Sequence, residues 1–287
     1  MLLVTGAGGH TARYFFERLS AEGYQGKIRA VFRSEAGAEG FSYPALDIEK
    51  VYGDISRADT CRRILPGVET VLHIASIRLS KRIVTIGRNK GVQWFILIHT
   101  TARYSKHRMA FAAYAAIEDG LLERPDDLTI LRPTMIYGSA MDKNMSRLIA
   151  LLSRTPVFPV FGAGRALMQP VYAPDLARAY WQVMQNRDVT RGRAYNLPGR
   201  EALPYRRILA LVAKALNRRI LFLPVPIAPT AWLARKLGKR SPVTEEQVLR
   251  LGEDKNFDWA AAARDFGYDP TAFEEGITAQ VANRPKP

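Results

Sequence analysis

The first residues of the chain combine an apolar run, a glycine-rich turn and a helical pattern. Met1–Val4 are apolar, Thr5–Ala12 read Thr-Gly-Ala-Gly-Gly-His-Thr-Ala, and a helical pattern follows to residue 21. In a strand–turn–helix of this kind Gly6 allows the tight turn, Gly9 lets the backbone approach a ligand, and Ala12 lets the helix pack closely on the strand. The free N–H groups and the positive dipole end of the helix then bind an anion. The pattern predicts a dinucleotide pyrophosphate site, with a chance glycine-rich turn as the alternative; its candidate ligands are Gly6, Gly8, Gly9, His10 and Thr11.

The end of the second expected strand indicates which dinucleotide is bound. A carboxylate there would hold the ribose hydroxyls of NAD, whereas an arginine accommodates the 2′-phosphate of NADP. This chain has Arg33 at that point and Arg13 just after the glycine turn. Guanidinium groups match phosphate geometry, so the sequence favours NADP(H) over NAD(H). The alternative is that Arg33 is simply exposed, and Glu35 lies close by in the sequence.

The ends of the third and fourth expected strands supply further candidate cofactor contacts. Asp54 and Ile55 follow the third strand, where a side chain reaches the adenine edge; a turn aspartate is the alternative. Ala75 and Ser76 end the fourth strand and are small enough to let the chain pass a cofactor closely. His73, two residues before Ala75, is interpreted as a core residue.

The elements that must position these residues alternate along the first half of the chain. We expect strands near 1–5, 28–32, 50–52, 70–75, 94–100 and 128–132, and helices near 10–21, 57–65, 78–89 and 107–123. This alternation predicts an α/β fold, a Rossmann-type doubly wound parallel sheet. After Pro133 prolines break the pattern, and a smaller lobe is expected, with helices near 205–216 and 243–252. The expected domains are 1–138 and 139–287, with segments near 170–200, including a strand at 194–197, returning to the core.

The composition is basic, with a net charge of +15, but the charge is scattered along the chain. Its densest run is Arg235–Arg240, behind the apolar residues 231–233. That run is interpreted as a solvated helix end, with a weak peripheral membrane contact as the alternative. A nucleic-acid function rests on charge alone and is not favoured. Cys61 is the single cysteine, so it can form neither an internal disulfide nor a cysteine-based metal site, and we expect a cytoplasmic protein without a metal. No apolar run approaches ~20 residues and the fold begins at the first residues, so we expect neither a membrane span nor a signal peptide. We expect a monomer or a homodimer.

Several segments, in order along nearly the whole chain, resemble the short-chain dehydrogenase/reductase superfamily in its extended branch of NAD(P)-dependent sugar-nucleotide epimerases and dehydratases. The glycine turn is similar to TGxxGxxG, Gly53–Ile55 to an adenine-binding GD segment, and Leu72–Ala75 to an hHhA strand end. Three later segments match as well: Leu131–Gly138 resembles hRPxxhYG, Val171–Ala177 resembles hxVxDhA, and Tyr195–Leu197 resembles a YNh strand. The resemblance implies that Pro133, Thr134 and Met135 lie beside the nicotinamide.

The resemblance also implies a catalytic Ser/Thr, a tyrosine and a lysine in a YxxxK motif. Thr100 and Tyr114 stand where the hydroxyl and the tyrosine belong, but Glu118 replaces the lysine. Residues i and i+4 share a helix face, so Glu118 is expected on the same ligand surface as Tyr114. A carboxylate there disfavours the tyrosinate form and removes the cation of the motif. We therefore expect Glu118 to accept hydrogen bonds from the ribose hydroxyls, and Glu118→Lys to keep the cofactor affinity.

The second lobe is expected to bind a small-molecule substrate such as a sugar nucleotide. The candidate contacts are Thr101, Tyr137, Arg165 and Gln169, with a surface hairpin as the alternative for the turn at Arg165. The favoured function is an atypical NADP(H)-dependent oxidoreductase or epimerase/dehydratase acting on such a carbonyl or hydroxyl substrate. The alternative is a catalytically silent NAD(P)H-binding redox sensor or accessory subunit. The NmrA-like regulators and the accessory subunit of respiratory complex I are similar in keeping the fold without the lysine.

Overall fold

The centre of the molecule is a seven-stranded parallel sheet. The computed structural model describes residues 1–106, 111–226, 228, 236 and 252–284. The strand order is β11-β6-β5-β4-β1-β2-β3, and every neighbouring pair is parallel. This doubly wound order confirms the fold class expected from the sequence. The strands are β1 (Leu2–Thr5), β2 (Ile28–Phe32), β3 (Ile48–Tyr52), β4 (Thr70–His73), β5 (Trp94–Ile98), β6 (Leu128–Pro133) and β11 (Arg193–Leu197).

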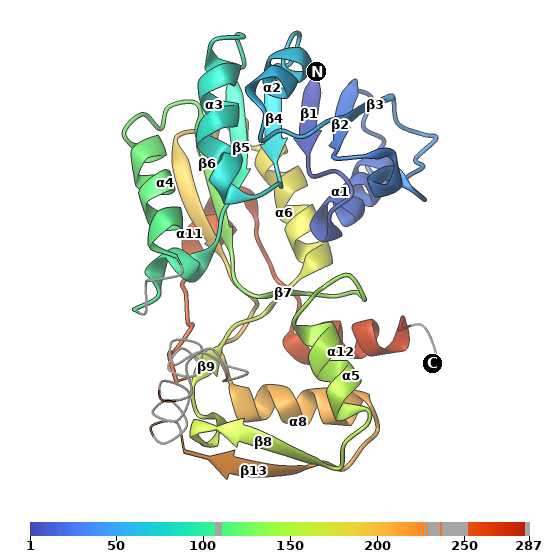
Figure 1. The fold of residues 1–287 in the computed structure, drawn as a ribbon, viewed down its shortest axis with the longest axis vertical. Coiled ribbons are helices and arrows are strands. Elements are labelled where there is room, and N and C mark those ends of the chain that lie inside the picture. Colours follow the sequence, from blue (N-terminus) through green and yellow to red (C-terminus); the bar gives the residue numbers. More distant parts are fainter. Residues whose placement is uncertain (107–110, 227, 229–235, 237–251, 285–287) are drawn as a thin grey trace.

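Helices cover both faces of this sheet, as Figure 1 shows. Successive side chains of a strand point to opposite faces, so Leu2 and Val4 enter one core and Leu3 enters the other. The first core is closed by α1 (His10–Ala21), α6 (Ala173–Gln185) and α11 (Ala260–Phe266). The second core is closed by α2 (Ala58–Ile64), α3 (Ser80–Arg88) and α4 (Ala112–Leu122).

Two expected elements end or begin differently because short 3-10 turns follow the strands. The strand expected to reach residue 100 ends at Ile98, because Thr101–Tyr104 form a 3-10 turn in which the N–H of Ala102 donates to the side chain of Thr100. The helix expected from residue 78 begins at Ser80, after a 3-10 turn capped by Ser76. The strand expected at 194–197 is present as β11 and joins β6. The helix expected near 243–252 and the basic run Arg235–Arg240, except Lys236, lie outside the described residues.

A second lobe lies below the carboxyl ends of the sheet strands in Figure 1. It has its own apolar core, and three two-stranded sheets belong to it or join it to the main sheet. Its elements are α5 (Met145–Leu152), α8 (Tyr205–Ala215), α12 (Phe273–Ala282) and the strand pairs β7 (Ile136–Tyr137) with β10 (Val171–Tyr172), β9 (Leu167–Met168) with β12 (Leu203–Pro204), and β8 (Val157–Phe161) with β13 (Leu221–Val225); the short α7 (Arg187–Thr190) precedes β11. Where the boundary between the two domains falls stays a prediction.

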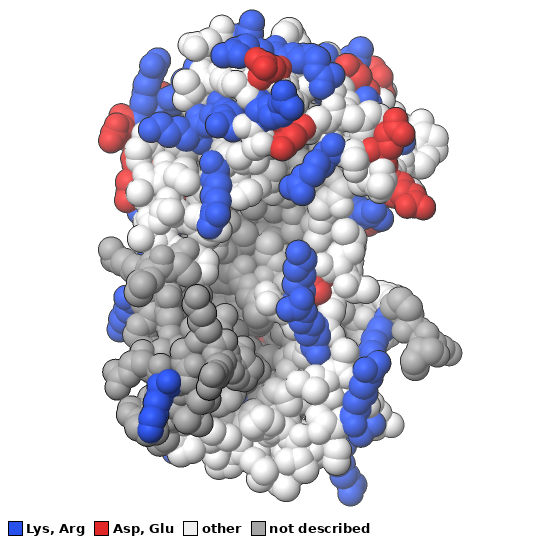
Figure 2. Space-filling view, viewed as in Figure 1, with Lys and Arg blue, Asp and Glu red and all other residues white. Residues whose placement is uncertain are grey.

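Figure 2 shows that the molecule is hollowed between the sheet domain and the second lobe, with Lys and Arg side chains on both sides of the hollow. The carboxyl ends of the parallel strands face this hollow, and in open α/β sheets that edge is the one that binds ligands. Among the described residues, no helix is both long and apolar enough to cross a bilayer.

Candidate functional site

The glycine turn forms a cradle of backbone atoms at the start of α1. Gly6 has a φ of +70°, and a Cβ on it would lie 3.0 Å from the backbone nitrogen of Ala75. A Cβ on Gly8 would lie 2.4 Å from the carbonyl oxygen of Gly37, and one on Gly9 would lie 2.9 Å from that of Gly6. The first N–H groups of α1 have no acceptor within the helix. The turn therefore needs glycine at all three positions, and it presents free donors to an anion, as a pyrophosphate requires.

Two side chains of the first helical turn keep buried polar atoms without a partner in the described part of the chain. They are the Nε2 atom of His10 and the Nε atom of Arg13. Burial lowers the pKa of His10, which keeps its imidazole neutral. Buried donors and acceptors normally have a partner, so these two atoms indicate that a polar ligand belongs beside the turn. Thr11 is buried and instead accepts a hydrogen bond from Tyr180.

His73 fixes the strand ends below the cradle. It is completely buried, and burial lowers its pKa to about 4, so the ring is neutral. Its Nε2–H donates to the carbonyl oxygen of Ser76, which leaves Nδ1 to accept from the hydroxyl of Thr5 at 2.7 Å. The interpretation of His73 as a core residue is in keeping with this geometry. It ties the end of β1 to the turn that carries Ala75 and Ser76, and the backbone of Ala75 lies against Gly6. The contact of Ala75 and Ser76 with a cofactor stays a prediction.

The candidate contacts to the adenosine half of the cofactor lie near the short 3-10 segment Glu35–Ala38. The carbonyl group of Gly37 in this segment lies beside Gly8 of the glycine turn. Arg33 is exposed at the end of β2, and its charge contributes to the low pKa of Asp54, which the backbone N–H of Ser56 lowers most. Asp54 accepts that hydrogen bond at 2.8 Å, so one of its oxygens serves a turn. Arg13 lies beside the same segment, with its Nη2 atom 3.5 Å from the carbonyl oxygen of Glu39.

Several further expected cofactor contacts are buried or bonded within the protein. The side chain of Ile55, expected at the adenine edge, is buried in the core, and Pro133, expected beside the nicotinamide, is buried as well. Thr134 donates its hydroxyl hydrogen to the carbonyl oxygen of Gln169, and Met135 packs on the core of the second lobe. These residues pack within the protein or bond to its backbone at this edge. Their contact with a cofactor stays a prediction.

Thr100 and Tyr114 lie at the ends of neighbouring elements beside this edge. The Oγ1 atom of Thr100 accepts from the N–H of Ala102 at 3.1 Å and keeps its own hydrogen to donate. Tyr114 is half-buried on α4, and the guanidinium carbon of Arg78 lies 5.6 Å from its ring centroid. Arg78, on the turn after β4, is a cation that sequence reasoning missed. Its distance of 36 residues from Tyr114 gives no sequence signal.

The expectation for Glu118 is wrong in this structure. Its side chain is completely buried and does not share an accessible ligand surface with Tyr114. Both carboxylate oxygens are occupied by three partners: Oε1 accepts from Arg103 and from Arg132, at 2.8 Å from the Nε atom of the latter, and Oε2 accepts from His99 at 2.7 Å. Ribose hydroxyls therefore have no access to it. The helical i, i+4 rule places two residues on one face, but tertiary packing covers the second of them.

The charges around Glu118 explain its protonation state. Burial would raise the pKa of this carboxyl, but hydrogen bonds from His99 and Arg132 and the charge of Arg132 outweigh it, and the pKa falls to about 2. Burial lowers the pKa of His99, so the ring is neutral and its Nδ1–H donates to the carboxylate, while Nε2 accepts from Ser80. The cluster is thus a buried ion pair with a neutral imidazole. Arg103 and Arg132 come from 14 or more residues away, which is why spacing alone did not reveal them.

Three of the four expected substrate contacts are buried inside the protein. Tyr137 is fully buried against Tyr172 and Phe273, and burial raises the pKa of its hydroxyl strongly. Gln169 is buried, donating to the carbonyl oxygen of Gly199 and accepting from the N–H of Phe257.

Thr101 is buried too and donates to the carbonyl oxygen of Pro133. The expectations for Tyr137, Gln169 and Thr101 as substrate contacts are therefore wrong, because a ligand cannot reach them. Arg165 is exposed at the end of a 3-10 turn, so its role stays a prediction.

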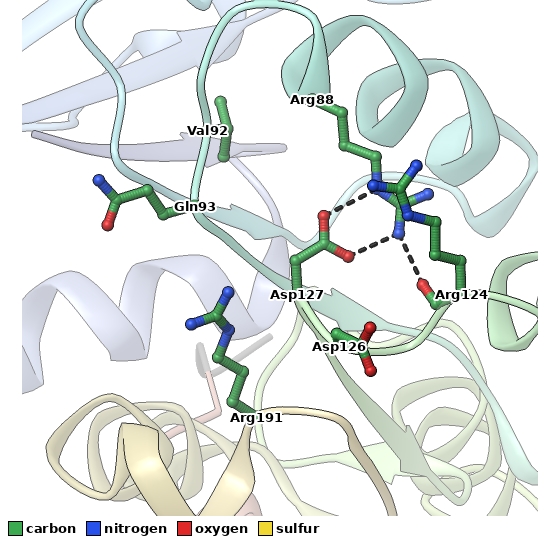
Figure 3. Close-up of a pocket in the computed structure, with 7 residues that line it drawn as sticks. All are labelled: Arg88, Val92, Gln93, Arg124, Asp126, Asp127 and Arg191. Carbon is green, nitrogen blue, oxygen red and sulfur yellow. Dashed lines mark hydrogen bonds and ion pairs between the residues drawn. The ribbon is translucent and has the colours of Figure 1, made fainter.

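A polar pocket of about 420 Å³ lies at the opposite, amino-terminal edge of the sheet. Figure 3 shows Arg88 binding both carboxylate oxygens of Asp127 and the backbone oxygen of Arg124. This pairing joins the end of α3 to the loop before β6. The pocket is remote from the carboxyl edge of the sheet, and the ion pair between Arg88 and Asp127 in it has a structural role.

The sheet order, the glycine turn and the second lobe define a protein with a Rossmann-type α/β fold. Residues 104–197, about a third of the chain, match the model of the NAD dependent epimerase/dehydratase family.

The individual proteins that resemble this chain have names that give different activities. The chain is similar to the NADH dehydrogenase [ubiquinone] 1 alpha subcomplex subunit 9 of Arabidopsis thaliana, with 21% identity over 276 residues, 87% of this chain and 67% of that protein. It is 24% identical over 174 residues to the ceramide reductase of Caulobacter vibrioides, 56% of this chain and 53% of that protein. Among solved structures, the dTDP-glucose 4,6-dehydratase DesIV of Streptomyces venezuelae, determined with NAD, superposes with a TM-score of 0.73 at 19% identity over 98% of this chain and 96% of that one.

Proposed function

We propose that this chain is a nicotinamide-dinucleotide-binding protein of the accessory or sensor kind, which holds the cofactor without Tyr–Lys chemistry. The proposal that Tyr–Lys chemistry is absent rests on Glu118. At the position of the motif lysine stands a carboxylate that is closed inside ion pairs with Arg103 and Arg132. The binding half of the site has its glycine cradle and free N–H groups, which fit a pyrophosphate. The burial of Tyr137 and Gln169 adds support, because it removes two of the expected contacts to a sugar nucleotide.

A second candidate function is an atypical oxidoreductase in which Thr100 and Tyr114 act on a carbonyl or hydroxyl substrate. The observation that favours it is Arg78, whose guanidinium carbon lies 5.6 Å from the ring of Tyr114 and supplies a cation beside it. A bound nicotinamide would provide the hydride for such a reaction. The relatives include both a reductase and a respiratory-complex subunit, which keeps both functions under test.

Substituting Tyr114 by phenylalanine tests the first function against the second. If the protein only binds the cofactor, Tyr114→Phe should bind NADPH with unchanged affinity in a calorimetric titration, because no reaction depends on the hydroxyl. Wild type and variant should also consume NADPH at the same background rate with a panel of aldehydes and ketones. A carbonyl substrate that wild type reduces and Tyr114→Phe reduces about a hundredfold more slowly would instead establish the oxidoreductase.

We also propose that the cofactor is NADP(H) in preference to NAD(H), read by Arg33 and Arg13. The ligands 2′,5′-ADP (adenosine 2′,5′-bisphosphate) and 5′-AMP differ only in the 2′-phosphate, so they isolate this contact. We expect 2′,5′-ADP to raise the melting temperature more than 5′-AMP, and Arg33→Ala to reduce the difference, because a charge-assisted bond to phosphate contributes ~1.5–3 kcal/mol. Arg62→Ala, an exposed arginine paired with Asp59 on α2, is the matched control. Equal shifts with both ligands in wild type would contradict the preference.

A further inference from the structure

The far end of the second lobe carries a small parallel sheet with two different faces. Registered residues of neighbouring strands point to the same side of a sheet, and β8 pairs with β13 from Val157 and Leu221 onward. One face enters the core of the lobe through Phe158, Val160 and Phe222. The other face, here called the distal apolar face, consists entirely of apolar residues: Val157, Pro159, Phe161, Leu221, Leu223 and Val225.

The distal apolar face is open to solvent from its first residue pair, Val157 and Leu221, to Leu223 in the middle of β13. Leu221 is 60% exposed, Leu223 is 46% exposed and Val157 is 40% exposed. Single exposed apolar side chains are ordinary, but a contiguous apolar surface on one face of a sheet marks an interaction site. The described part of the chain has eight exposed large apolar residues, and three of them lie on this face.

Positive charge gathers at one end of this face. Because β8 and β13 are parallel, both begin at the same end, where the N–H of Leu221 donates to the carbonyl oxygen of Pro156. Exposed arginines precede both strands: Arg154 before β8, and Arg218 and Arg219 before β13. The segments 143–174 and 202–226, which include both strands, contain nine basic residues and no acidic one, and two of the nine, Arg207 and Lys214 on α8, pair with Glu274 of α12.

We propose that the distal apolar face docks the protein on an anionic lipid bilayer. Aliphatic side chains enter the boundary between headgroups and acyl chains, while the arginines extend their apolar stems and keep their charges at the anionic headgroups. Each basic residue near such a surface adds ~1 kcal/mol of attraction. A second copy of the chain fits this face less well, because the segments that form the face offer the arginines no acidic partner.

The test measures co-sedimentation of the full chain with vesicles of phosphatidylcholine alone and of a phosphatidylcholine/phosphatidylglycerol mixture. Wild type should bind the mixed vesicles and not the neutral ones. The double variant Leu221→Ser/Leu223→Ser should bind the mixed vesicles about tenfold or more weakly, because two partly buried leucines are lost from the contact. Val189→Ser, which removes a similarly exposed apolar residue on α7, is the matched control and should bind like wild type. Arg218→Glu/Arg219→Glu should weaken binding most at low salt.

A labelled variant keeps the proposal testable if the serine variant folds poorly. Cys61 is buried, so Leu221→Cys offers a single accessible thiol for an environment-sensitive fluorophore. Its emission should shift to the blue on addition of mixed vesicles and stay unchanged with neutral ones. Absence of wild-type binding to mixed vesicles, or equal binding by the serine variant, would overturn the proposal. Binding to an acidic protein or to RNA without any response to mixed vesicles would overturn it as well.

Discussion

Replacing Glu118 by lysine should lower the free energy of unfolding by about 3–5 kcal/mol, because it removes one partner of a buried ion pair and leaves the others uncompensated. Three cations, Arg103, Arg132 and the new ammonium, would then share a volume that now holds a carboxylate. At the ~2–4 °C per kcal/mol usual for domains of 150–250 residues, the melting temperature should fall by about 10 °C. The sequence alone led to a different expectation, that Glu118→Lys keeps the cofactor affinity, because it did not show that the carboxylate is buried among arginines.

The neighbouring Asp119 offers a matched control. Its side chain is 60% exposed and pairs with the same Arg103, so Asp119→Lys should cost at most about 1 kcal/mol. Both variants should be compared by chemical denaturation and by thermal melting. If Glu118→Lys keeps the wild-type melting temperature while Asp119→Lys lowers it, the account of a buried ion pair is wrong.

The pH dependence of stability gives an independent check of the same cluster. Because the pKa of Glu118 is lowered from 4.5 to about 2, its contribution to stability is fully present above pH 4.5 and is lost as the pH falls toward 2. Glu118→Gln cannot titrate, so the stability difference between wild type and this variant should shrink across that window. A difference that stays constant from neutral pH to pH 3 would show that the carboxyl is not held in its charged form.

Replacing Gly9 by valine should abolish binding of NADPH while the protein stays folded. The backbone of Gly9 has an ordinary helical-entry conformation, with a φ of −73°, but its Cβ would lie 2.9 Å from the carbonyl oxygen of Gly6. The turn must therefore shift, and the valine methyl groups occupy the space in front of the first N–H groups of α1. Loss of two hydrogen bonds to phosphate, each ~1.5–3 kcal/mol, corresponds to about a hundredfold weaker binding or more.

A second glycine substitution separates this effect from a general loss of stability. Gly120 lies in α4 with open space around its Cα, so Gly120→Ala should bind NADPH like wild type and be slightly more stable. Calorimetric titration gives the affinity, and denaturant unfolding gives the stability of each variant. Wild-type affinity in a folded Gly9→Val protein would mean that the glycine turn is not the pyrophosphate site.

The residues that the sequence identified well are those whose role is carried by the backbone. Glycines 6, 8 and 9, the small Ala75 and the apolar runs of the strands act through conformation and close packing, which local sequence patterns report directly. The doubly wound sheet and the position of the cradle followed from the same signals. Distances of a few residues were enough to predict them.

The reactive end of the site depends on side chains that meet from distant parts of the chain, and there the sequence misled. Glu118, Tyr137 and Gln169 were all expected at the ligand site, but packing buries each of them, and the polar atoms of Glu118 and Gln169 are bonded to the surrounding protein. A buried carboxylate requires partners because an unpaired charge in the interior costs several kcal/mol, and those partners, Arg103, Arg132 and His99, lie on other elements. The sequence by itself thus determined the fold and the glycine turn at the start of α1. Only the tertiary structure decided that Glu118 is a structural ion-pair partner, since burial and charge pairing are properties of the assembled chain.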